Sequence, residues 1–420
     1  MKTLINDFEE FNIRKKKLSF LLVFVILFFL VSCNRSTGNR EQDNKDDLSA
    51  VSNKENIDRD DGTFREEEML ETHFSESNTY SFSELELYKE TGVDKEKYEI
   101  RILDSDKNSI FFTIDAKRDD KRLAEGILSK TEELCVYKVN EKSFDVIREF
   151  GGYYITQGYL ACDKYIALGI QLSEKDTNYS VFYGDKGRLN EIYKGENTWH
   201  FSMWPSLVKL DTGIVLFEPQ IESGGRDDII TGVELLRLQN AALEKTDLQI
   251  PDDFALLSSE TKSDRGSFVT FWENKKEQRA YFVLVDEKGI QKTTPLPKKY
   301  RLMTFTLSEN KVIAIVELGH EKRYKILVFD MDSGLLYANN FPYVTQMLSL
   351  SSGGKIIIRS DDHGIYVLEF ENNELYLKKA NVKGIDKSLL SRKILFTEFG
   401  DKVILTVYDK PKRFIVLEIK

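Results

Sequence analysis

Two tryptophans and a histidine lie close together in one short segment of this 420-residue chain. Trp199, His200 and Trp204 fall within the run Trp-His-Phe-Ser-Met-Trp-Pro, which holds two of the chain's three tryptophans. An exposed pair of indole rings offers a stacking platform for a sugar ring or an anchor for a protein partner. Large aromatic side chains are more often buried, so packing between neighbouring structural units is the competing interpretation.

Ionisable side chains form three further candidate sites. Arg226 lies in the run Glu-Ser-Gly-Gly-Arg-Asp-Asp, His320 precedes a glutamate, and Asp362 and His363 are adjacent. Imidazole and carboxylate groups could serve acid–base chemistry or bind a metal, but these residues show no close metal-ligand spacing. Asp and Gly in turns need no further function. We therefore expect no metal, no cofactor and no catalytic residue among them.

Motifs of hydrolytic enzymes are absent from the sequence. It contains no Gly-x-Ser-x-Gly, no His-Glu-x-x-His and no Ser-x-Asp-x-Gly-x-x-Trp. Catalysis is therefore not expected. The alternative is a glycan-active hydrolase or lyase, which would require His320, Asp362 and His363 to converge in space.

The elements that must position these residues are short β-strands. From about residue 81, runs rich in Val, Ile, Leu, Phe and Tyr alternate with short turns containing Gly, Asp, Asn or Lys. Seven pairs of strands are predicted: Ser109–Ala116 with Glu133–Val139, Tyr165–Leu172 with Asn178–Tyr183, Gly213–Glu218 with Val233–Leu238, Ser267–Trp272 with Ala280–Val285, Lys311–Glu317 with Tyr324–Phe329, Lys355–Arg359 with Gly364–Phe370, and Lys402–Tyr408 with Arg413–Ile419.

The spacing of these pairs, about 35 to 55 residues, is typical of propeller blades. Seven pairs predict an all-β, seven-bladed β-propeller. The last unit has only three strands before the chain ends, so we expect Tyr80–Tyr88 to supply its fourth strand and close the ring. Two separate β-sandwiches are the rival architecture.

One turn pattern resembles a known family. The run Ile326–Gly334, Ile-Leu-Val-Phe-Asp-Met-Asp-Ser-Gly, resembles the third strand and turn of bacterial propellers of the TolB and YVTN type. By analogy with propellers, ligands would bind at one mouth of the channel, on loops that join successive blades or follow second strands. This analogy places Trp204, Arg226, His320 and Asp362 on one rim.

The N-terminus has the features of an export signal. Basic residues 14–17 precede an apolar run at 18–30, which is shorter than the roughly 20 residues that span a bilayer. The following Leu-Val-Ser-Cys resembles the lipobox of bacterial lipoproteins, which implies cleavage before Cys33 and its lipidation. The resemblance implies a lipid-anchored protein at the cell membrane or outer membrane, facing the extracytoplasmic side.

The segment after the signal is acidic. Residues 34–80 contain 13 acidic and 6 basic side chains, which accounts for −7 of the chain's formal −10. Its composition predicts a disordered linker. The expected organisation is a signal at 1–33, a linker at 34–79 and the propeller at 80–420. We expect a non-catalytic binding or scaffolding module for an envelope protein or glycan, and no binding of nucleic acid because no basic face is predicted.

Overall fold

A computed structural model of the chain describes residues 72–75, 79–117, 130–161, 163–171, 177–197, 205–210, 213–222, 229–246, 254–264, 266–286, 289–318, 323–341, 344–350, 354–360, 364–371, 374–382 and 392–419. The chain divides into two units, residues 1–59 and 60–420, and every described residue belongs to the second. No described helix is long and apolar enough to cross a membrane.

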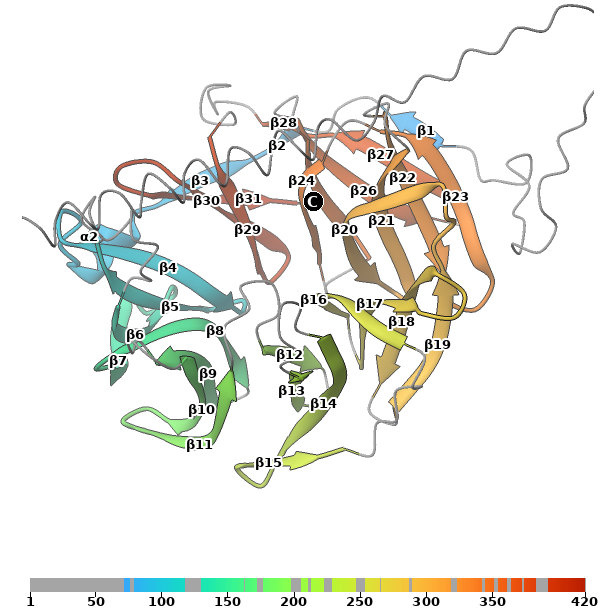
Figure 1. Cartoon of the computed structure of the whole chain (residues 1–420). Helices are drawn as coiled ribbons and strands as arrows, with labels where there is room; N and C mark the ends of the chain where they lie inside the picture. The colour runs from blue at the N-terminus through green and yellow to red at the C-terminus, as the bar shows by residue number, and fades with distance from the viewer. Residues whose placement is uncertain are drawn as a thin grey trace, which may run out of the picture. The chain divides into compact units, whose positions relative to one another are not determined.

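The second unit is a seven-bladed β-propeller, as the sequence predicts (Figure 1). Blade 1 contains β4 (Tyr98–Ser105), β5 (Ser109–Ala116), β6 (Thr131–Lys138) and β7 (Ser143–Glu149). Blade 2 contains β8 (Tyr153–Ala161), β9 (Lys164–Gln171), β10 (Thr177–Asp185) and β11 (Arg188–Asn197). Blade 3 contains β12 (Ser206–Leu210), β13 (Gly213–Glu222), β14 (Ile229–Gln239) and β15 (Ala242–Lys245).

The other four blades repeat this order. Blade 4 contains β16 (Phe254–Asp264), β17 (Ser267–Asn274), β18 (Arg279–Asp286) and β19 (Gly289–Pro295). Blade 5 contains β20 (Tyr300–Ser308), β21 (Lys311–Leu318), β22 (Arg323–Asp330) and β23 (Gly334–Asn340). Blade 6 contains β24 (Val344–Ser349), β25 (Ile356–Ser360), β26 (Ile365–Glu371) and β27 (Glu374–Lys379), and blade 7 contains β29 (Ile394–Phe399), β30 (Lys402–Val407) and β31 (Arg413–Glu418).

The seven predicted strand pairs are the second and third strands of the seven blades. Strand β21 shows why these strands are so apolar. Val312 and Val316 pack with residues of blade 4, whereas Ile313 and Ile315 pack with residues of blade 6. Because each blade is covered on both faces, its central strands bury successive side chains rather than alternate ones.

The turn between β22 and β23 is held by its first aspartate. The Asp330 carboxylate accepts hydrogen bonds from the backbone N–H groups of Asp332 at 2.9 Å and Ser333 at 3.0 Å. Gly334 follows with φ of 91°, a conformation that other residues rarely adopt. The sequence pattern thus sets the tight connection between β22 and β23.

The ring is closed by a strand from the start of the unit, as predicted. β3 (Phe82–Leu85) pairs antiparallel with β31 and completes blade 7. The Ser81 hydroxyl donates to the Glu418 carboxylate at 2.7 Å, and Arg413 forms an ion pair with Glu84 at 2.9 Å. The short helix α2 (Leu87–Thr91) then leads into blade 1, and its Leu87 is fully buried beside residues of blades 1 and 7.

Two further short strands precede β3. β1 (Thr72–Ser75) pairs in parallel with β27, and β2 (Thr79–Tyr80) pairs in parallel with β28 (Asn381–Val382). Strand β1 therefore lies inside the segment 34–79 for which composition predicts disorder. It adds a fifth strand to blade 6.

Candidate binding cavity at the hairpin mouth of the channel

One cavity among the described residues lies at one mouth of the central channel. Its volume is about 1470 Å³, and it is lined by residues from the innermost strands of blades 1, 2, 3, 5, 6 and 7. Residues of the hairpins that connect first to second strands and third to fourth strands also line it. It therefore opens on the face where these hairpins turn.

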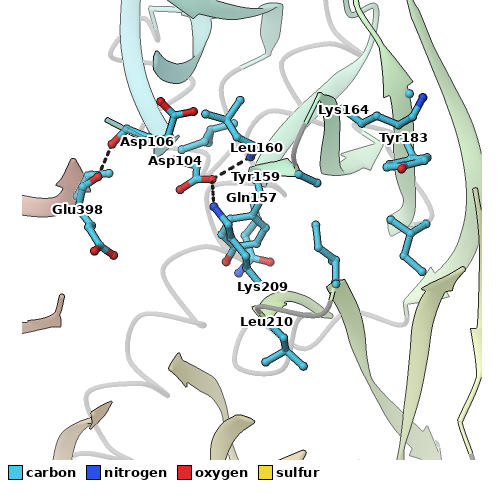
Figure 2. A pocket seen from close by; sticks show the side chains of 18 of the residues that line it. Asp104, Asp106, Gln157, Tyr159, Leu160, Lys164, Tyr183, Lys209, Leu210 and Glu398 are labelled. Carbon is cyan, nitrogen blue, oxygen red and sulfur yellow. Dashed lines mark hydrogen bonds and ion pairs between the residues drawn. The ribbon is translucent and has the colours of Figure 1, made fainter. Parts of the chain in front are cut away.

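An ion pair between two blades stands at the wall of this cavity. The Asp104 carboxylate, on β4, accepts a hydrogen bond from the Lys209 ammonium group, on β12, at 2.9 Å. The same carboxylate oxygen accepts the backbone N–H of Leu160, on β8, at 2.9 Å. Asp104 thus joins blades 1, 2 and 3, and Figure 2 shows both interactions converging on it.

Two side chains of β8 in the cavity wall hold the backbone of β12 in place. The Tyr159 hydroxyl donates to the backbone carbonyl of Leu207 at 3.2 Å, and the Gln157 side-chain oxygen accepts the Leu207 N–H at 2.6 Å. Burial, with a further contribution from the Asp104 charge, raises the pKa of Tyr159 well above its ordinary value. The phenol therefore stays neutral and acts as a hydrogen-bond donor. The Lys209 ammonium group also lies 5.9 Å from the centre of its ring.

The charges around the cavity balance. Among the described residues that line it, four are acidic and four are basic: Asp104, Asp106, Asp185 and Glu398, and Lys107, Lys164, Arg188 and Lys209. A second ion pair joins the Lys164 ammonium group to the Asp185 carboxylate at 3.0 Å. Apolar side chains such as Leu210, Ile214 and Phe396 lie between them. The described part of the lining is therefore mixed, and its charges balance.

β-bulges set the direction of several of these side chains. The pairing of β4 with β5 shifts register between Ile102 and Asp104, and that of β8 with β9 shifts between Ile155 and Gln157. A bulge inserts one residue and re-aims the side chains that follow. Asp104 and Gln157 come directly after these shifts. The bulges therefore help to place the polar groups that line the channel.

The opposite end of the innermost strands carries a second, smaller cavity of about 200 Å³. Here Arg101 forms an ion pair with Asp115 at 3.0 Å, and Asp115 accepts the Thr131 hydroxyl at 2.8 Å. The Thr131 oxygen in turn accepts the Ile155 N–H at 3.1 Å. These interactions pair the polar groups with one another and join blade 1 to blade 2.

All the site residues predicted from the sequence lie outside the described residues: Cys33, Trp199, His200, Trp204, Arg226, His320, Asp362 and His363. The strands around the last seven are described. β11 ends at Asn197 and β12 begins at Ser206, while β13, β21 and β25 each end just before one of the other segments. All these strand ends belong to the face opposite the cavity. Strand β13, for example, begins at Gly213 in the cavity wall and ends at Glu222.

The cavity residues were not predicted from the sequence. Asp104 and Lys209 are 105 positions apart and resemble ordinary polar residues of a strand. The only indication of the cavity in the sequence is that the first strands of the blades contain polar residues, such as Asp104, Gln157 and Lys209, close to apolar ones. Within the described part of the chain, no three His, Cys, Asp or Glu side chains come together as a metal site.

No protein-family model and no curated protein matches this chain. Solved structures similar to it include Hsv2 of Kluyveromyces lactis, at 12% identity, with 77% of this chain and 98% of that one covered and a TM-score of 0.45. BamB from Moraxella catarrhalis is 12% identical, with 76% and 85% covered and a TM-score of 0.40. The Dos1 propeller is 9% identical, with 76% and 95% covered and a TM-score of 0.44.

Proposed function

We propose that this chain is a lipid-anchored, extracytoplasmic propeller of the TolB/YVTN type that binds a protein partner without catalysis. The anchor is the Cys33 of the lipobox-like Leu-Val-Ser-Cys, which follows the short apolar run at 18–30. The acidic segment between Cys33 and the first strands serves as the tether. This arrangement holds the propeller near the membrane surface.

The cavity at the hairpin mouth is the proposed contact surface. Its volume of about 1470 Å³ exceeds the roughly 300–1,000 Å³ of ordinary small-molecule sites. The balanced charges of the described lining do not favour a polyanion, and its apolar residues suit a protein loop better than a free sugar. The observation that carries this proposal is the balanced, mixed lining of a wide, open cavity.

Anchoring is tested by replacing the cysteine. In cells fed an alkyne-tagged fatty acid, the wild-type chain is expected to carry the label and to enter the detergent phase on phase separation. Cys33→Ala is expected to lose both properties, whereas Cys135→Ala keeps them because Cys135 is a buried, free thiol of β6. Labelling of the Cys33→Ala chain would contradict the anchor.

Partner binding is tested by photo-crosslinking in cells. A photoreactive residue at Asn190, which is exposed and lines the cavity, is expected to capture an envelope protein. The same residue at Lys298, an exposed position between β19 and β20, serves as the control. Lys107→Glu, at the cavity, should abolish the Asn190 product, and the matched Lys298→Glu should leave it intact. Identical products from both positions would refute the cavity as the contact surface.

A further inference from the structure

The smaller cavity, at the opposite end of the innermost strands, has a lining unlike that of the larger one. Its volume is about 200 Å³, and residues of blades 1, 6 and 7 line it. Two cations, Arg101 and Lys412, are among the described lining residues, and no acidic residue is. The other described lining residues are neutral polar or apolar. The excess of positive charge in this lining favours an anionic ligand.

The two cations differ in how far the protein already pairs them. Arg101 donates to the Asp115 carboxylate and to the backbone carbonyl of Ile155. The Lys412 side chain is only 8% exposed, and its single ion pair in the described structure is with Glu99 at 2.8 Å. Glu99 is 44% exposed and does not line the cavity. Since an ammonium group has three donors and is costly to bury unpaired, Lys412 can still bind an anion in the cavity.

Two hydroxyl groups line the same cavity. Thr406 is buried, and Tyr408 is half-buried, with its ring centre 4.8 Å from the Lys412 ammonium nitrogen. Neither hydroxyl forms a hydrogen bond with another described residue. Burial raises the pKa of Tyr408, so its phenol keeps its proton. Both hydroxyls can therefore donate to a carboxylate that accepts from Lys412.

An apolar side chain forms another part of the wall. Leu395 is 38% exposed, and among the described residues it is the one large apolar side chain that is exposed. It lies on the innermost strand β29 and pairs with Thr406 on β30, so the two side chains share one face of blade 7. Contact with an apolar group would remove the exposed surface of Leu395 from water, which is favourable.

We propose that the smaller cavity binds a small monocarboxylic acid with an apolar body. Its carboxylate accepts from the Lys412 ammonium group and from the hydroxyls of Thr406 and Tyr408, and its body packs on Leu395. The volume suits such a molecule, because an engineered cavity of about 150 Å³ in another protein holds benzene. Sulfate and phosphate suit it less, since they are costly to dehydrate and offer Leu395 no apolar group. This site does not depend on the function proposed for the larger cavity.

The test uses the full chain and para-fluorobenzoate as the probe, with binding followed by fluorine NMR. The neutral para-fluorobenzamide has nearly the same shape and should bind about tenfold more weakly or worse, because it brings no charge to Lys412. Unlabelled benzoate should displace the probe, whereas sulfate at the same concentration should not. Absence of probe binding, equal binding of the acid and the amide, or equal displacement by sulfate would overturn the proposal.

Substitutions then locate the bound probe. Lys412→Met keeps an unbranched side chain beside the Tyr408 ring and should weaken binding by about tenfold or more. Lys393→Met is the matched control, because Lys393 also lies 4.8 Å from the centre of that ring but does not line the cavity. Its binding of the probe should stay unchanged. Equal losses in the two variants would refute the site.

A second substitution keeps the test decisive if Lys412→Met fails to fold. Leu395 is exposed toward the cavity, so Leu395→Phe should fill part of the space without disturbing the packed core. This variant should fold and lose the probe. Probe binding by Leu395→Phe equal to that of the wild-type chain would show that the probe binds elsewhere and would refute the proposal.

Discussion

The carboxylate of Asp104 and the ammonium group of Lys209 lie 2.9 Å apart although they belong to blades 1 and 3. The innermost strand of blade 2 contacts the same group, because its Leu160 N–H donates a hydrogen bond to the carboxylate oxygen that faces Lys209. One side chain at the channel wall therefore connects three blades. The two partners are unequal, because Asp104 is 15% exposed and Lys209 is 40% exposed.

Replacing the acid should cost more stability than replacing the base. Asp104→Ala leaves the Leu160 N–H without its acceptor, so we expect the free energy of unfolding to fall by about 1–3 kcal/mol. Lys209→Met keeps the bond to Leu160 and removes a half-exposed pair, for which we expect a loss below about 1 kcal/mol. Denaturant titration of both variants measures the difference. Equal losses would mean that the backbone bond contributes nothing.

Closure of blade 7 should depend on particular amide groups of β3. Glu418 N–H donates to the Ser81 carbonyl at 3.0 Å, so in this antiparallel ladder the N–H of Ser83 faces β31 and that of Glu84 faces away. Ser83→Pro should therefore weaken the ring by about 1–3 kcal/mol and speed deuterium exchange in β31. Glu84→Pro is the matched control and should lose only its exposed ion pair with Arg413. Similar exchange in both variants would contradict the register.

The loss of folding stability at low pH should arise in part from Glu369. Burial alone would raise the pKa of this carboxyl group, but hydrogen bonds from Lys378 and Lys355 outweigh it and hold the pKa below its ordinary value. The stabilisation is therefore present above the unfolded pKa, about 4.3, and is lost as the pH falls through the lower folded value. Glu369→Gln should be less stable at neutral pH, and its stability should fall less between pH 5 and 3. Parallel pH profiles for the two chains would exclude this role.

Tyr193 should titrate late. Burial, followed by its hydrogen bond to Glu218 at 2.7 Å, raises the pKa of this phenol to about 12. Its contribution to stability is complete below the unfolded pKa of about 10 and is lost as the pH rises through the folded value. Near-ultraviolet absorbance of the wild-type chain at pH 11 should show fewer phenolates than its tyrosine content gives after unfolding, because Tyr159 and Tyr193 both have raised pKa values. In Tyr193→Phe this shortfall should be smaller by one phenolate; an unchanged shortfall would mean that Tyr193 does not titrate late.

The sequence reveals the central strands of each blade because burial on both faces makes them continuous apolar runs, as in Val312–Val316. It also predicts the closing strand, since the last unit lacks one. The cavity was not predicted, because Asp104, Leu160 and Lys209 become neighbours only when the blades are arranged in a ring. The aromatic and histidine-containing segments were predicted as sites because their residue types are unusual. The charged lining of the channel has common residue types at ordinary strand positions, so it was not predicted.

The pairing of β3 with β31 also determines when the molecule can be completed. Ser81 and Glu418 are 337 positions apart, so the hydrogen bond between them can form only after the residues of all seven blades have been synthesised. Contacts this distant in sequence form slowly because the intervening chain must first lose much of its freedom. A polypeptide that stopped before Arg413 would have an unfinished last blade and two open sheet edges. Closure of this ring therefore has to follow the synthesis of all seven blades.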